Sequence, residues 1–359
     1  MVRIQKNISL KNLSNYRIGG PASFFAEVKN PEELSQVLKD RKKLENPKIF
    51  VLGEGTNVLF KDSGFDGLVI KNKINGIKIL DDRESKSSSF AKASKDKQRV
   101  KGSESQRVKV GAGVLLEDLL AFCIENSLSG FQWAGGLPGT LGGAVRGNAG
   151  AFGGEIKDNI IEVESLDSST LEIKKRSVNQ CKFGYRTSVF KSQKESEFKR
   201  VRESKSQSEK ESESKRAAGQ EIIISATLSL TKRNRDDIAS KIQEKIDYRN
   251  LKHPLEYPNI GSIFKNIPVE KVPQKILKQL RDSIKNDPFP ILPTAKLLAV
   301  ASLKGKRQGG AMVSKKHPNF IINFNNATSE DVKTLIHKLK EIIKSKYGIE
   351  LEEEISNLG

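Results

Sequence analysis

Three short segments hold side chains that can bind anions or transfer protons. Tyr185 and Arg186 are adjacent in CKFGYRTSVF, where an aromatic face lies beside a guanidinium that can bind an anion through two hydrogen bonds. Ser262 follows a glycine in the proline-bounded segment HPLEYPNIGSIFKNIP, and Glu354 ends the acidic run of the strand-like segment IELEEEI. Residue type alone leaves ordinary alternatives open: a surface ion pair for the arginine, a turn for the serine and a solvated strand for the glutamate.

The segment GEGTN, residues 53–57, follows a strand-like run and could bring backbone N–H groups close to a phosphate. Its two glycines let the backbone approach a ligand, and Thr56 and Asn57 add side-chain donors. It lacks the third glycine and the following helix of a Rossmann fingerprint. On its own it is better explained by a tight hairpin, with phosphate binding as the alternative.

The segment WAGGLPGTLGGAVRGNAGAFGGEI, residues 133–156, is the richest in glycine. Its nine glycines in 24 residues are about five times the average usage of roughly 7%. Its charged residues are Arg146 and Glu155, so it differs from the polar Ser/Gly mixtures of flexible linkers. A nearly uncharged, glycine-rich backbone indicates a chain that wraps closely around a large ligand.

The chain must position these residues on alternating α and β elements, in two blocks divided at about residue 231. Runs rich in β-branched and aromatic residues predict strands at residues 23–28, 48–53, 67–72, 108–114, 160–167, 171–176 and 221–230. Helices are predicted at residues 31–43, 115–128, 235–250 and 328–348. The last has Thr328 or Ser329 as its cap, Gly348 as its terminator and one apolar face. That face consists of Val332, Leu335, Ile336, Leu339, Ile342 and Ile343.

Two tracts, residues 81–108 and 191–217, are rich in serine and charge and poor in apolar residues. Such segments cannot bury enough surface to offset the entropy of ordering them. This favours solvated insertions, with a functional binding arm as the alternative. The tracts carry +6 of the net charge of +19, so most of the basic bias lies in the rest of the chain.

Composition argues against several classes of protein. No run approaches the roughly 18 apolar residues of a membrane span, and the N-terminus lacks the apolar stretch of a secretory signal. Two distant cysteines and three histidines without HExxH spacing argue against a disulfide scaffold or a metal site, and suit a reducing cytoplasm. The charge of +19 alone suggests a nucleic-acid partner, but aromatic residues are only 6% and no RNP, KH or zinc-finger pattern occurs.

Seven motifs together resemble the UDP-N-acetylenolpyruvoylglucosamine reductases, also called UDP-N-acetylmuramate dehydrogenases, of bacterial peptidoglycan synthesis. The resemblance is to the shorter, type II form. One motif would be weak, whereas seven in the family's order between residues 16 and 355 are specific. They are YRIGGPA, LGEGTNVLFKDSGFDGLVI, LPGTLGGAVRGNAGAFGGEI, FGYRTSVFK, PLEYPNIGSIFKN, LKGKRQGGAMVSKKHPNFIIN and IELEEEI.

The resemblance implies an α+β fold: a PCMH-type (vanillyl-alcohol-oxidase-like) FAD-binding domain in two subdomains, plus a smaller α+β C-terminal substrate-binding domain. Residues 1–72 would form the first FAD-binding subdomain and residues 73–230 the second, which contains both insertions. Residues 231–348 would bind the substrate, and residues 349–359 would form a C-terminal strand with the catalytic acid. FAD would be non-covalent, since no histidine precedes His253.

Carried over position by position, the resemblance also implies the site. Arg186, Ser262 and Glu354 fall on catalytic positions, and no metal is implied. Tyr185, Asn266, Lys304 and His317 fall on positions that line the substrate site. The implied FAD-binding residues are Gly53, Glu54, Gly55, Thr56, Asn57, Pro138, Gly139, Thr140, Gly142, Gly143, Asn148, Gly150 and Gly153.

The implied reaction is the NADPH-dependent, FAD-mediated reduction of UDP-N-acetylglucosamine enolpyruvate to UDP-N-acetylmuramate. Reduced flavin would add hydride to the enolpyruvyl methylene carbon, so that negative charge develops on the conjugated carboxylate. Arg186 would stabilise this charge, a protonated Glu354 would donate a hydrogen bond, and Ser262 would protonate the α carbon. The resemblance thus implies an oxidoreductase of cell-wall biogenesis, cell shape and cell division: cytoplasmic, monomeric, and bound to neither nucleic acid nor membrane.

The sequence departs from the family near the catalytic acid. Glu353 replaces a usual proline, and Ser356 replaces an arginine. Phe152 stands where tyrosine is common, and Gly147 where a larger residue is usual. Three alternatives therefore stay open: another PCMH-type flavin oxidoreductase, a catalytically impaired paralogue and, more remotely, a basic nucleic-acid-binding protein.

Overall fold

The computed structural model describes residues 2–44, 47–81, 105–191 and 220–359. The predicted insertions 81–108 and 191–217 therefore lie almost entirely outside the described residues. The predicted end of the first insertion is wrong for residues 105–108, because these residues begin a strand. They do so because Ser105–Val108 pair with Leu228–Thr231 of a long neighbouring strand.

Contacts divide the chain into two compact units. The first unit contains residues 1–3, 26–47 and 70–243. The second contains residues 4–25, 48–69 and 244–359, so the chain passes between the units several times. The predicted domain boundaries after residues 72, 230 and 348 stay predictions.

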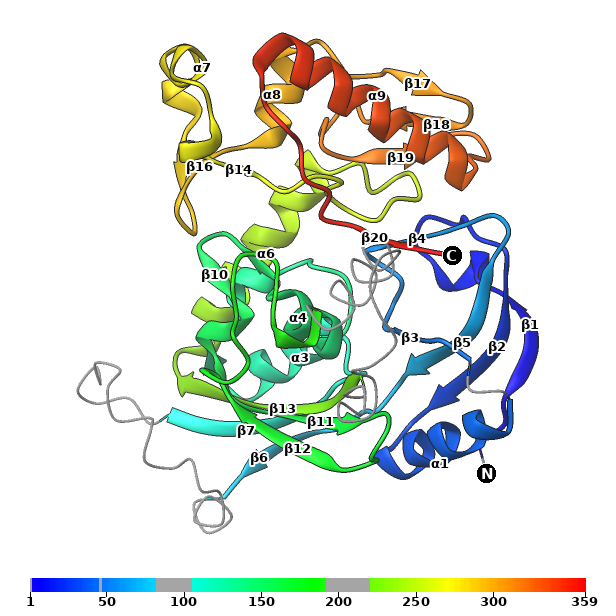
Figure 1. Cartoon of the computed structure of the whole chain (residues 1–359). Helices are drawn as coiled ribbons and strands as arrows, with labels where there is room; N and C mark the ends of the chain where they lie inside the picture. Colours follow the sequence, from blue (N-terminus) through cyan, green and yellow to red (C-terminus); the bar gives the residue numbers. More distant parts are fainter. Residues whose placement is uncertain (1, 45–46, 82–104, 192–219) are drawn as a thin grey trace, which may run out of the picture. The chain divides into compact units, whose positions relative to one another are not determined.

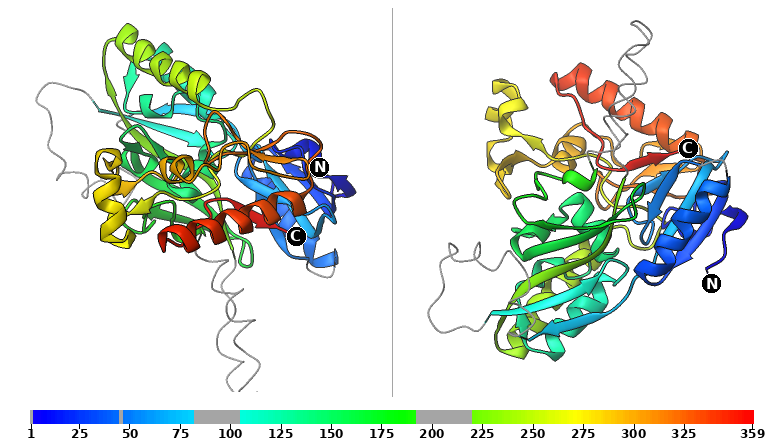
Figure 2. Two further views of the ribbon diagram at one scale, coloured as in Figure 1. Left: turned by 90° about the horizontal axis from the view of Figure 1, so that it is seen from above. Right: turned by 60° about the horizontal axis from the view of Figure 1, so that its bottom comes forward.

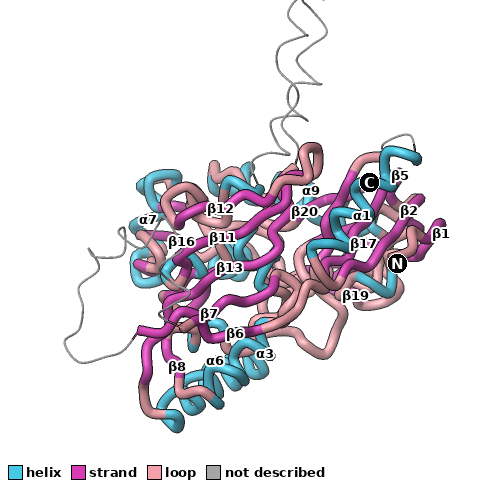
Figure 3. The backbone as a smooth tube through the Cα atoms, turned by 90° about the horizontal axis from the view of Figure 1, so that it is seen from below, coloured by secondary structure: helices cyan, strands magenta, loops and turns pink. Residues whose placement is uncertain are grey.

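An antiparallel sheet forms the centre of the first unit (Figure 1). Among the described residues its strand order is β12-β11-β13-β7-β6, and β8 pairs with the end of β13. Figure 3 shows these strands side by side. Their bounds are β6 (Ile77–Leu80), β7 (Ser105–Gly111), β8 (Leu128–Ser129), β11 (Ile160–Asp167), β12 (Ile173–Ser177) and β13 (Glu221–Lys232).

Helices and short turns complete the first unit. α1 (Pro31–Arg41) begins as predicted, with Pro31 in its first turn and the Asn30 side chain accepting a hydrogen bond from the Glu33 N–H. α4 (Leu141–Gly147) packs against β13 and β7. The other elements are α3 (Leu116–Glu125), the hairpin of β9 (Gly150–Ala151) and β10 (Gly154–Glu155), and 3₁₀ turns at Lys42–Leu44, Gln132–Ala134 and Ile156–Asp158. α6 (Arg235–Lys252) starts in this unit and ends in the second.

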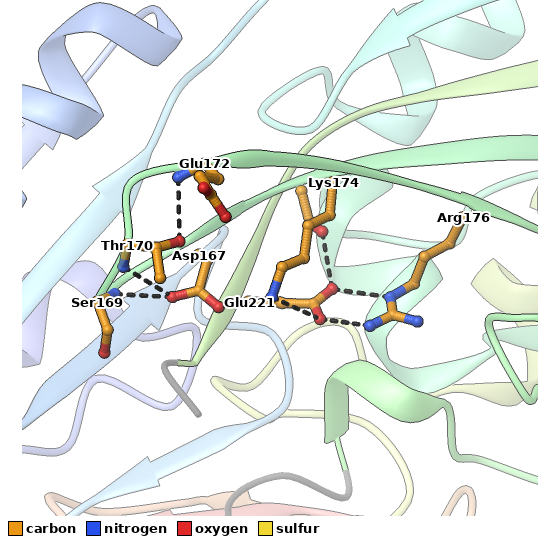
Figure 4. A network of polar contacts seen from close by, with 8 residues as sticks. Asp167, Ser169, Thr170, Glu172, Lys174, Arg176 and Glu221 are labelled. Carbon is orange, nitrogen blue, oxygen red and sulfur yellow. Dashed lines mark hydrogen bonds and ion pairs between the residues drawn. The ribbon is translucent and has the colours of Figure 1, made fainter. Parts of the chain in front are cut away.

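The β11–β12 edge of this sheet carries a network of charged side chains (Figure 4). Asp167 accepts hydrogen bonds from the N–H groups of Ser169 and Thr170 and pairs with Lys174. Glu221 on β13 uses its two carboxylate oxygens to bind the Arg176 guanidinium. Burial is acceptable for these acids because each is paired with a cation.

The second unit begins with a small sheet of order β1-β2-β5-β3. The bounds are β1 (Gln5–Ser9), β2 (Pro21–Val28), β3 (Ile49–Leu52) and β5 (Phe65–Asn72), and the last residues of β2 and β5 belong to the first unit. A 3₁₀ turn at Lys11–Leu13 follows β1. Leu10, Phe25, Leu52 and Phe60 belong to one apolar core that includes residues of this sheet.

The C-terminal part of the second unit packs helices against two short antiparallel sheets, β14-β16-β15 and β17-β18-β19. α9 (Ser329–Tyr347) packs on β17 and β18 (Figure 2). Its ends are as predicted, because Thr328 and Asp331 form a capping box and Gly348 has a left-handed backbone. The bounds are β14 (Ile267–Pro268), α7 (Gln274–Gln279), β15 (Lys285–Asn286), β16 (Pro290–Leu292), α8 (Thr294–Val300), β17 (Arg307–Gln308), β18 (Ala311–Val313) and β19 (Ile321–Asn323), with 3₁₀ turns at Val269–Lys271 and Arg281–Ser283.

The N-terminal and C-terminal parts of the second unit share one core. Tyr16 and Ile18 are buried among the apolar residues of α8, α9 and β18, and the Tyr16 hydroxyl donates to the Ile321 carbonyl at 2.7 Å. β4 (Val58–Phe60) also pairs in parallel with β20 (Ser356–Leu358). Residues near 60 and near 356 are therefore neighbours.

The C-terminal strand differs from its prediction. Residues 349–355 do not form a regular strand, and the acidic run has only a single bridge, between Phe264 and Glu353. The strand β20 begins after Glu354, at Ser356, because the chain there changes from an antiparallel to a parallel partner. Among the described residues, no helix combines the length and apolar composition needed to cross a bilayer.

Candidate active site

The start of α4 presents a face of glycines in the first unit. Thr140 caps the helix by accepting a hydrogen bond from the Gly143 N–H, and the Gly142 N–H donates to the Ala112 carbonyl at 2.8 Å. A Cβ atom on Gly142 would lie 3.0 Å from Ala112, so this glycine faces the protein. On the other face, a Cβ on Gly147 would meet no atom within 4 Å, and one on Gly143, one turn earlier, would be in ordinary contact with the Thr140 hydroxyl at 3.5 Å.

This face fits the adenine dinucleotide of a flavin. The surrounding segment has few charged side chains, and its glycines add no side chain on this face, as expected for a ligand that approaches the main chain closely. Within the described residues, the buried indole N–H of Trp133 has no hydrogen-bond partner, and this side chain lies against Gly154. The residues present are therefore compatible with FAD.

Polar contacts tie the end of α4 to the turn that contains Arg186. Asn148 ends the helix with a left-handed backbone, and its Nδ2 donates to the Gly184 carbonyl at 2.9 Å. The Arg186 guanidinium donates to the Gly150 carbonyl at 2.9 Å. The structure thus brings the predicted catalytic arginine to the predicted cofactor residues Asn148 and Gly150.

Arg186 itself has an unusual backbone. Gly184 and Thr187 bond to each other through both main-chain groups, so Tyr185 and Arg186 form a two-residue corner. Arg186 has φ +56°, a left-handed conformation that is uncommon for residues with a side chain and is often found at functional sites. The guanidinium carbon lies 5.3 Å from the Tyr185 ring centroid, and Lys191 Nζ donates to the Arg186 carbonyl at 3.0 Å.

In the second unit, the GEGTN segment forms a tight turn between β3 and β4. Gly55 has φ +65°, and a Cβ there would lie 2.2 Å from the Leu13 carbonyl oxygen. Only glycine fits this position, so the hairpin interpretation explains Gly55 by structure alone. Asn57 extends beyond the turn, because its Nδ2 donates to the Glu354 carbonyl at 3.3 Å.

Ser262 lies half-buried on a segment fixed by two asparagines. Asn259 accepts a hydrogen bond from the Gly261 N–H at 3.0 Å and donates to the Tyr257 carbonyl at 2.9 Å. Asn319 bonds the Phe264 main chain in both directions, at 3.1 and 2.8 Å. The serine is therefore presented by a loop with little freedom.

Glu354 is connected directly to this loop. Its N–H donates to the carbonyl of Ile263, the residue after Ser262, at 2.8 Å. Its own carbonyl accepts the hydrogen bond from Asn57. The second unit thus brings together Ser262 and Glu354, predicted as catalytic, with Asn57, predicted as a cofactor residue.

Two predicted substrate residues, His317 and Lys304, lie near this loop. His317 belongs to the turn that ends at Phe320, the residue that bridges to Ser262. Burial lowers the pKa of His317 to about 4, and the charge of Lys304 adds to this effect, so the imidazole is neutral at physiological pH. The rings of His253 and His317 are 5.3 Å apart, and burial lowers the pKa of His253 to about 3.

Asn266 and Tyr185 complete the predicted substrate residues. The Asn266 side chain accepts a hydrogen bond from the Thr294 N–H at 3.2 Å, so part of its role is to hold the start of α8. Tyr185 and Arg186 belong to the first unit, and Ser262, Asn266, Lys304, His317 and Glu354 belong to the second.

The residues that hold the catalytic candidates in place were not predicted from the sequence. Asn319 bonds the Phe264 main chain, 55 positions away, and Lys191 bonds the Arg186 carbonyl, five positions away. Each lies within one of the seven motifs, but their residue types do not indicate which main-chain groups they bond. Asn259 did have a signal, because an asparagine two residues before a glycine is typical of a side-chain-stabilised turn.

The antiparallel sheet with its glycine-rich face and the α+β C-terminal part have the fold of FAD-binding flavoproteins of the vanillyl-alcohol-oxidase type. Residues 22–172 match the family model described as FAD binding domain. A solved relative with the same fold is a VAO-type flavoprotein from Myceliophthora thermophila, with a TM-score of 0.50 and 11% identity over 94% of this chain and 73% of the other.

Sequence comparison identifies the family within that class. Residues 253–358 match the model described as UDP-N-acetylenolpyruvoylglucosamine reductase, C-terminal domain. Proteins named UDP-N-acetylenolpyruvoylglucosamine reductase are 34% identical in Carboxydothermus hydrogenoformans, over 99% of this chain and 94% of theirs, and 32% identical in Lachnoclostridium phytofermentans, over 99% and 93%. The chain belongs to the UDP-N-acetylenolpyruvoylglucosamine reductase family.

A solved structure agrees with this assignment at the level of the fold. The UDP-N-acetylenolpyruvylglucosamine reductase of Thermus caldophilus matches over the full length of both chains, with a TM-score of 0.67 and 24% identity. The fold class and the family predicted from the seven motifs are confirmed.

Proposed function

We propose that this chain uses FAD and NADPH to reduce UDP-N-acetylenolpyruvoylglucosamine to UDP-N-acetylmuramate, with Arg186, Ser262 and Glu354 as its catalytic residues. Family membership supports the reaction. The observation that carries the residue assignment is the hydrogen bond of 2.8 Å between the Glu354 N–H and the Ile263 carbonyl. That bond joins the segments that carry the Ser262 hydroxyl and the Glu354 carboxyl group, which are distant in the sequence.

The glycine-rich segments are proposed to supply the FAD-binding residues. Their backbone N–H groups and small side chains suit the pyrophosphate and allow close approach of the ring system. Bound FAD would supply hydride transfer from NADPH to the substrate. The residues proposed to hold it are those predicted from the sequence, in Gly53–Asn57, Pro138–Gly143 and Asn148–Gly153.

Each catalytic residue has one task in the proposed reaction. When the enolpyruvyl methylene carbon gains hydride, negative charge develops on the neighbouring carboxylate, and Arg186 stabilises it with a fixed positive charge. Glu354, in its protonated form, donates a hydrogen bond to the same carboxylate. Ser262 then gives its hydroxyl proton to the α carbon, so that one hydride and one proton saturate the double bond.

Tyr185, Asn266, Lys304 and His317 are proposed to bind the substrate. Lys304 is exposed and provides a cation for an anionic sugar nucleotide. A neutral His317 can donate or accept a hydrogen bond without adding charge. We further propose that the chain acts in the cytoplasm as a monomer on these small molecules, without nucleic-acid or membrane partners.

Stopped-flow measurement of the two half-reactions tests the proposal. Ser262→Ala should leave flavin reduction by NADPH unchanged and slow flavin reoxidation by UDP-N-acetylenolpyruvoylglucosamine by about 10²–10⁴-fold, the usual contribution of a general acid. Ser345→Ala, an exposed serine on α9, is the matched control and should leave both rates unchanged.

Equal loss of both half-reactions in Ser262→Ala would refute the role of this serine. The unmodified protein should be yellow and release flavin on denaturation. Turnover of NADPH only when the enolpyruvyl substrate is present separates an active reductase from an impaired paralogue and from another flavin oxidoreductase.

A further inference from the structure

The segment that carries Glu354 has few regular main-chain bonds. Between the end of α9 and the start of β20 it pairs only at Glu353, opposite Phe264. The bonds of that pair join Lys265 N–H to the Glu352 carbonyl and Glu354 N–H to the Ile263 carbonyl. The Glu354 main chain is held by its bonds to the Ile263 carbonyl and to Asn57 Nδ2, and the conformation of residue 353 also contributes to the direction of its side chain.

The three consecutive glutamates have different partners. Glu352 is exposed and pairs with Lys265 and Lys271. Glu353 points to the other side, as alternation in an extended segment requires, where its Oε1 binds Lys340 Nζ and its Oε2 accepts a hydrogen bond from Asn357 Nδ2 at 3.0 Å. Both oxygens of Glu353 are thus held, one by α9 and the other by β20.

The Lys340–Glu353 pair is also better shielded than its neighbours. The side chains of Lys340 and Glu353 are 35% and 25% exposed, whereas those of the next pair along the helix, Lys344 and Glu350, are 66% and 75% exposed. A shielded charge pair with a second hydrogen bond restricts its side chains more than an exposed pair does.

We propose that Lys340 and Asn357 are positioning residues: by holding the Glu353 carboxylate from two sides they fix the backbone before Glu354 and so orient the Glu354 carboxyl toward its catalytic position beside Ser262. This inference rests on the proposed role of Glu354. It gives Glu353 a function in this chain, where it occupies a place that proline usually has in the family.

The test uses the full-length FAD-loaded enzyme and the rate of flavin reoxidation by UDP-N-acetylenolpyruvoylglucosamine. Lys340→Met keeps the length of the side chain and removes its charge, and it should slow reoxidation by about tenfold. Flavin reduction by NADPH should not change. Lys344→Met, on the same face of α9 with an equivalent but exposed ion pair, is the matched control and should leave both rates within about twofold.

Two further variants separate positioning from general destabilisation. In a Glu354→Gln background, Lys340→Met should cause no additional slowing, because the carboxyl that it orients is already gone. The charge-swapped double variant Lys340→Glu with Glu353→Lys should restore reoxidation to within about threefold, since it rebuilds the ion pair.

Three results would overturn the inference. The first is that Lys340→Met reoxidises flavin at the same rate as Lys344→Met. The second is that Lys340→Met slows reoxidation by the same factor in the Glu354→Gln background as in the parent. Either result removes the positioning role while leaving Glu354 as a catalytic residue. If Glu354→Gln alone leaves reoxidation unchanged, the proposed role of Glu354 fails, and the inference fails with it.

Discussion

At the scale of single residues, Arg186 shows how structure can indicate function. A non-glycine residue in the left-handed region costs of order 1–3 kcal/mol, and such strain persists where the surrounding contacts impose it. Here those contacts are the Gly184–Thr187 main-chain pair and the bond from the guanidinium to the Gly150 carbonyl. The strained corner presents a fixed cation, which is what stabilisation of a developing charge requires.

Arg186→Asn tests this role without disturbing the corner, because asparagine tolerates the left-handed backbone. We expect flavin reoxidation by the enolpyruvyl substrate to slow by about 10²–10³-fold, as for the loss of one charge-stabilising donor. The melting temperature should change little, since the main-chain bonds of the corner remain. A variant that reoxidises at the normal rate would contradict the catalytic role of Arg186.

The links between catalytic candidates could not be predicted from the sequence. Asn57 and Glu354 are 297 positions apart, and the bond that joins them depends on the parallel pairing of β4 with β20. Asn319 lies in one of the seven motifs, but nothing in the sequence shows that its side chain fixes the Ser262 loop. The residues that do chemistry were found from their types and motifs, whereas the residues that hold them are determined by tertiary contacts.

At the scale of elements, features set by residues close together in the sequence were predicted correctly. α9 was predicted with its caps and α1 with its first residue, because the residues that start and end a helix lie within a few positions of its ends. The two- and three-residue strands β14 to β19 were not predicted, since strands this short are selected by their partners instead of their own propensity. Of the predicted strand at residues 349–359, Ser356–Leu358 form a strand and residues 349–355 do not, because the pairing with β4 selects it.

The glycine face of α4 gives a prediction that distinguishes structure from cofactor binding. Gly143→Ala adds a methyl group in ordinary contact with Thr140, and alanine in a helix should stabilise the FAD-free protein by about 0.5–1 kcal/mol. If FAD packs on this face, the methyl group should weaken FAD binding about tenfold or more, because overpacking costs about 1–3 kcal/mol.

Thermal melting over a series of FAD concentrations measures both effects of Gly143→Ala. Gly142→Ala is the comparison, because its methyl group would instead press on Ala112 and should lower stability with or without FAD. Unchanged FAD affinity in Gly143→Ala would show that the cofactor does not use this face.

The sheet of the first unit should make stability depend on pH through Glu164. Burial alone would raise the pKa of this carboxyl, but ion pairs with Lys109 and Lys175 and a hydrogen bond from Ser225 lower it to about 2. A carboxyl whose folded-state pKa is below its unfolded value of about 4.3 stabilises the protein above that value, and the contribution is lost as the pH falls toward 2.

Glu164→Gln should therefore lower the free energy of unfolding by about 1–2 kcal/mol at pH 7, after allowance for the exposure of both lysines. The difference from the parent protein should shrink between about pH 5 and pH 2. Glu172→Gln, an exposed glutamate on the same hairpin, is the control. A constant difference across this range, measured by urea unfolding, would exclude the titration of Glu164 as its origin.

At the scale of the whole molecule, family and fold were predictable because seven motifs occur in order along the chain. The net charge of +19 alone suggests a polynucleotide partner, whereas the motifs indicate a flavoenzyme. The structure belongs to an enzyme whose proposed ligands, FAD, NADPH and a sugar nucleotide, are all anionic. A basic surface therefore has a use in this family without any nucleic acid.

The tract between β6 and β7 gives the last prediction. Leu80 pairs with Arg107 in adjacent antiparallel strands, so a short Asn-Gly turn can replace residues 82–104 without moving either strand. If the tract is a solvated insertion, as its composition predicts, the shortened protein should bind FAD and consume NADPH within about twofold of the parent, since long insertions cost little and contribute little. Its melting temperature should stay equal or rise. A loss of turnover with FAD still bound would instead show that the tract is a functional arm that acts on the substrate or on NADPH.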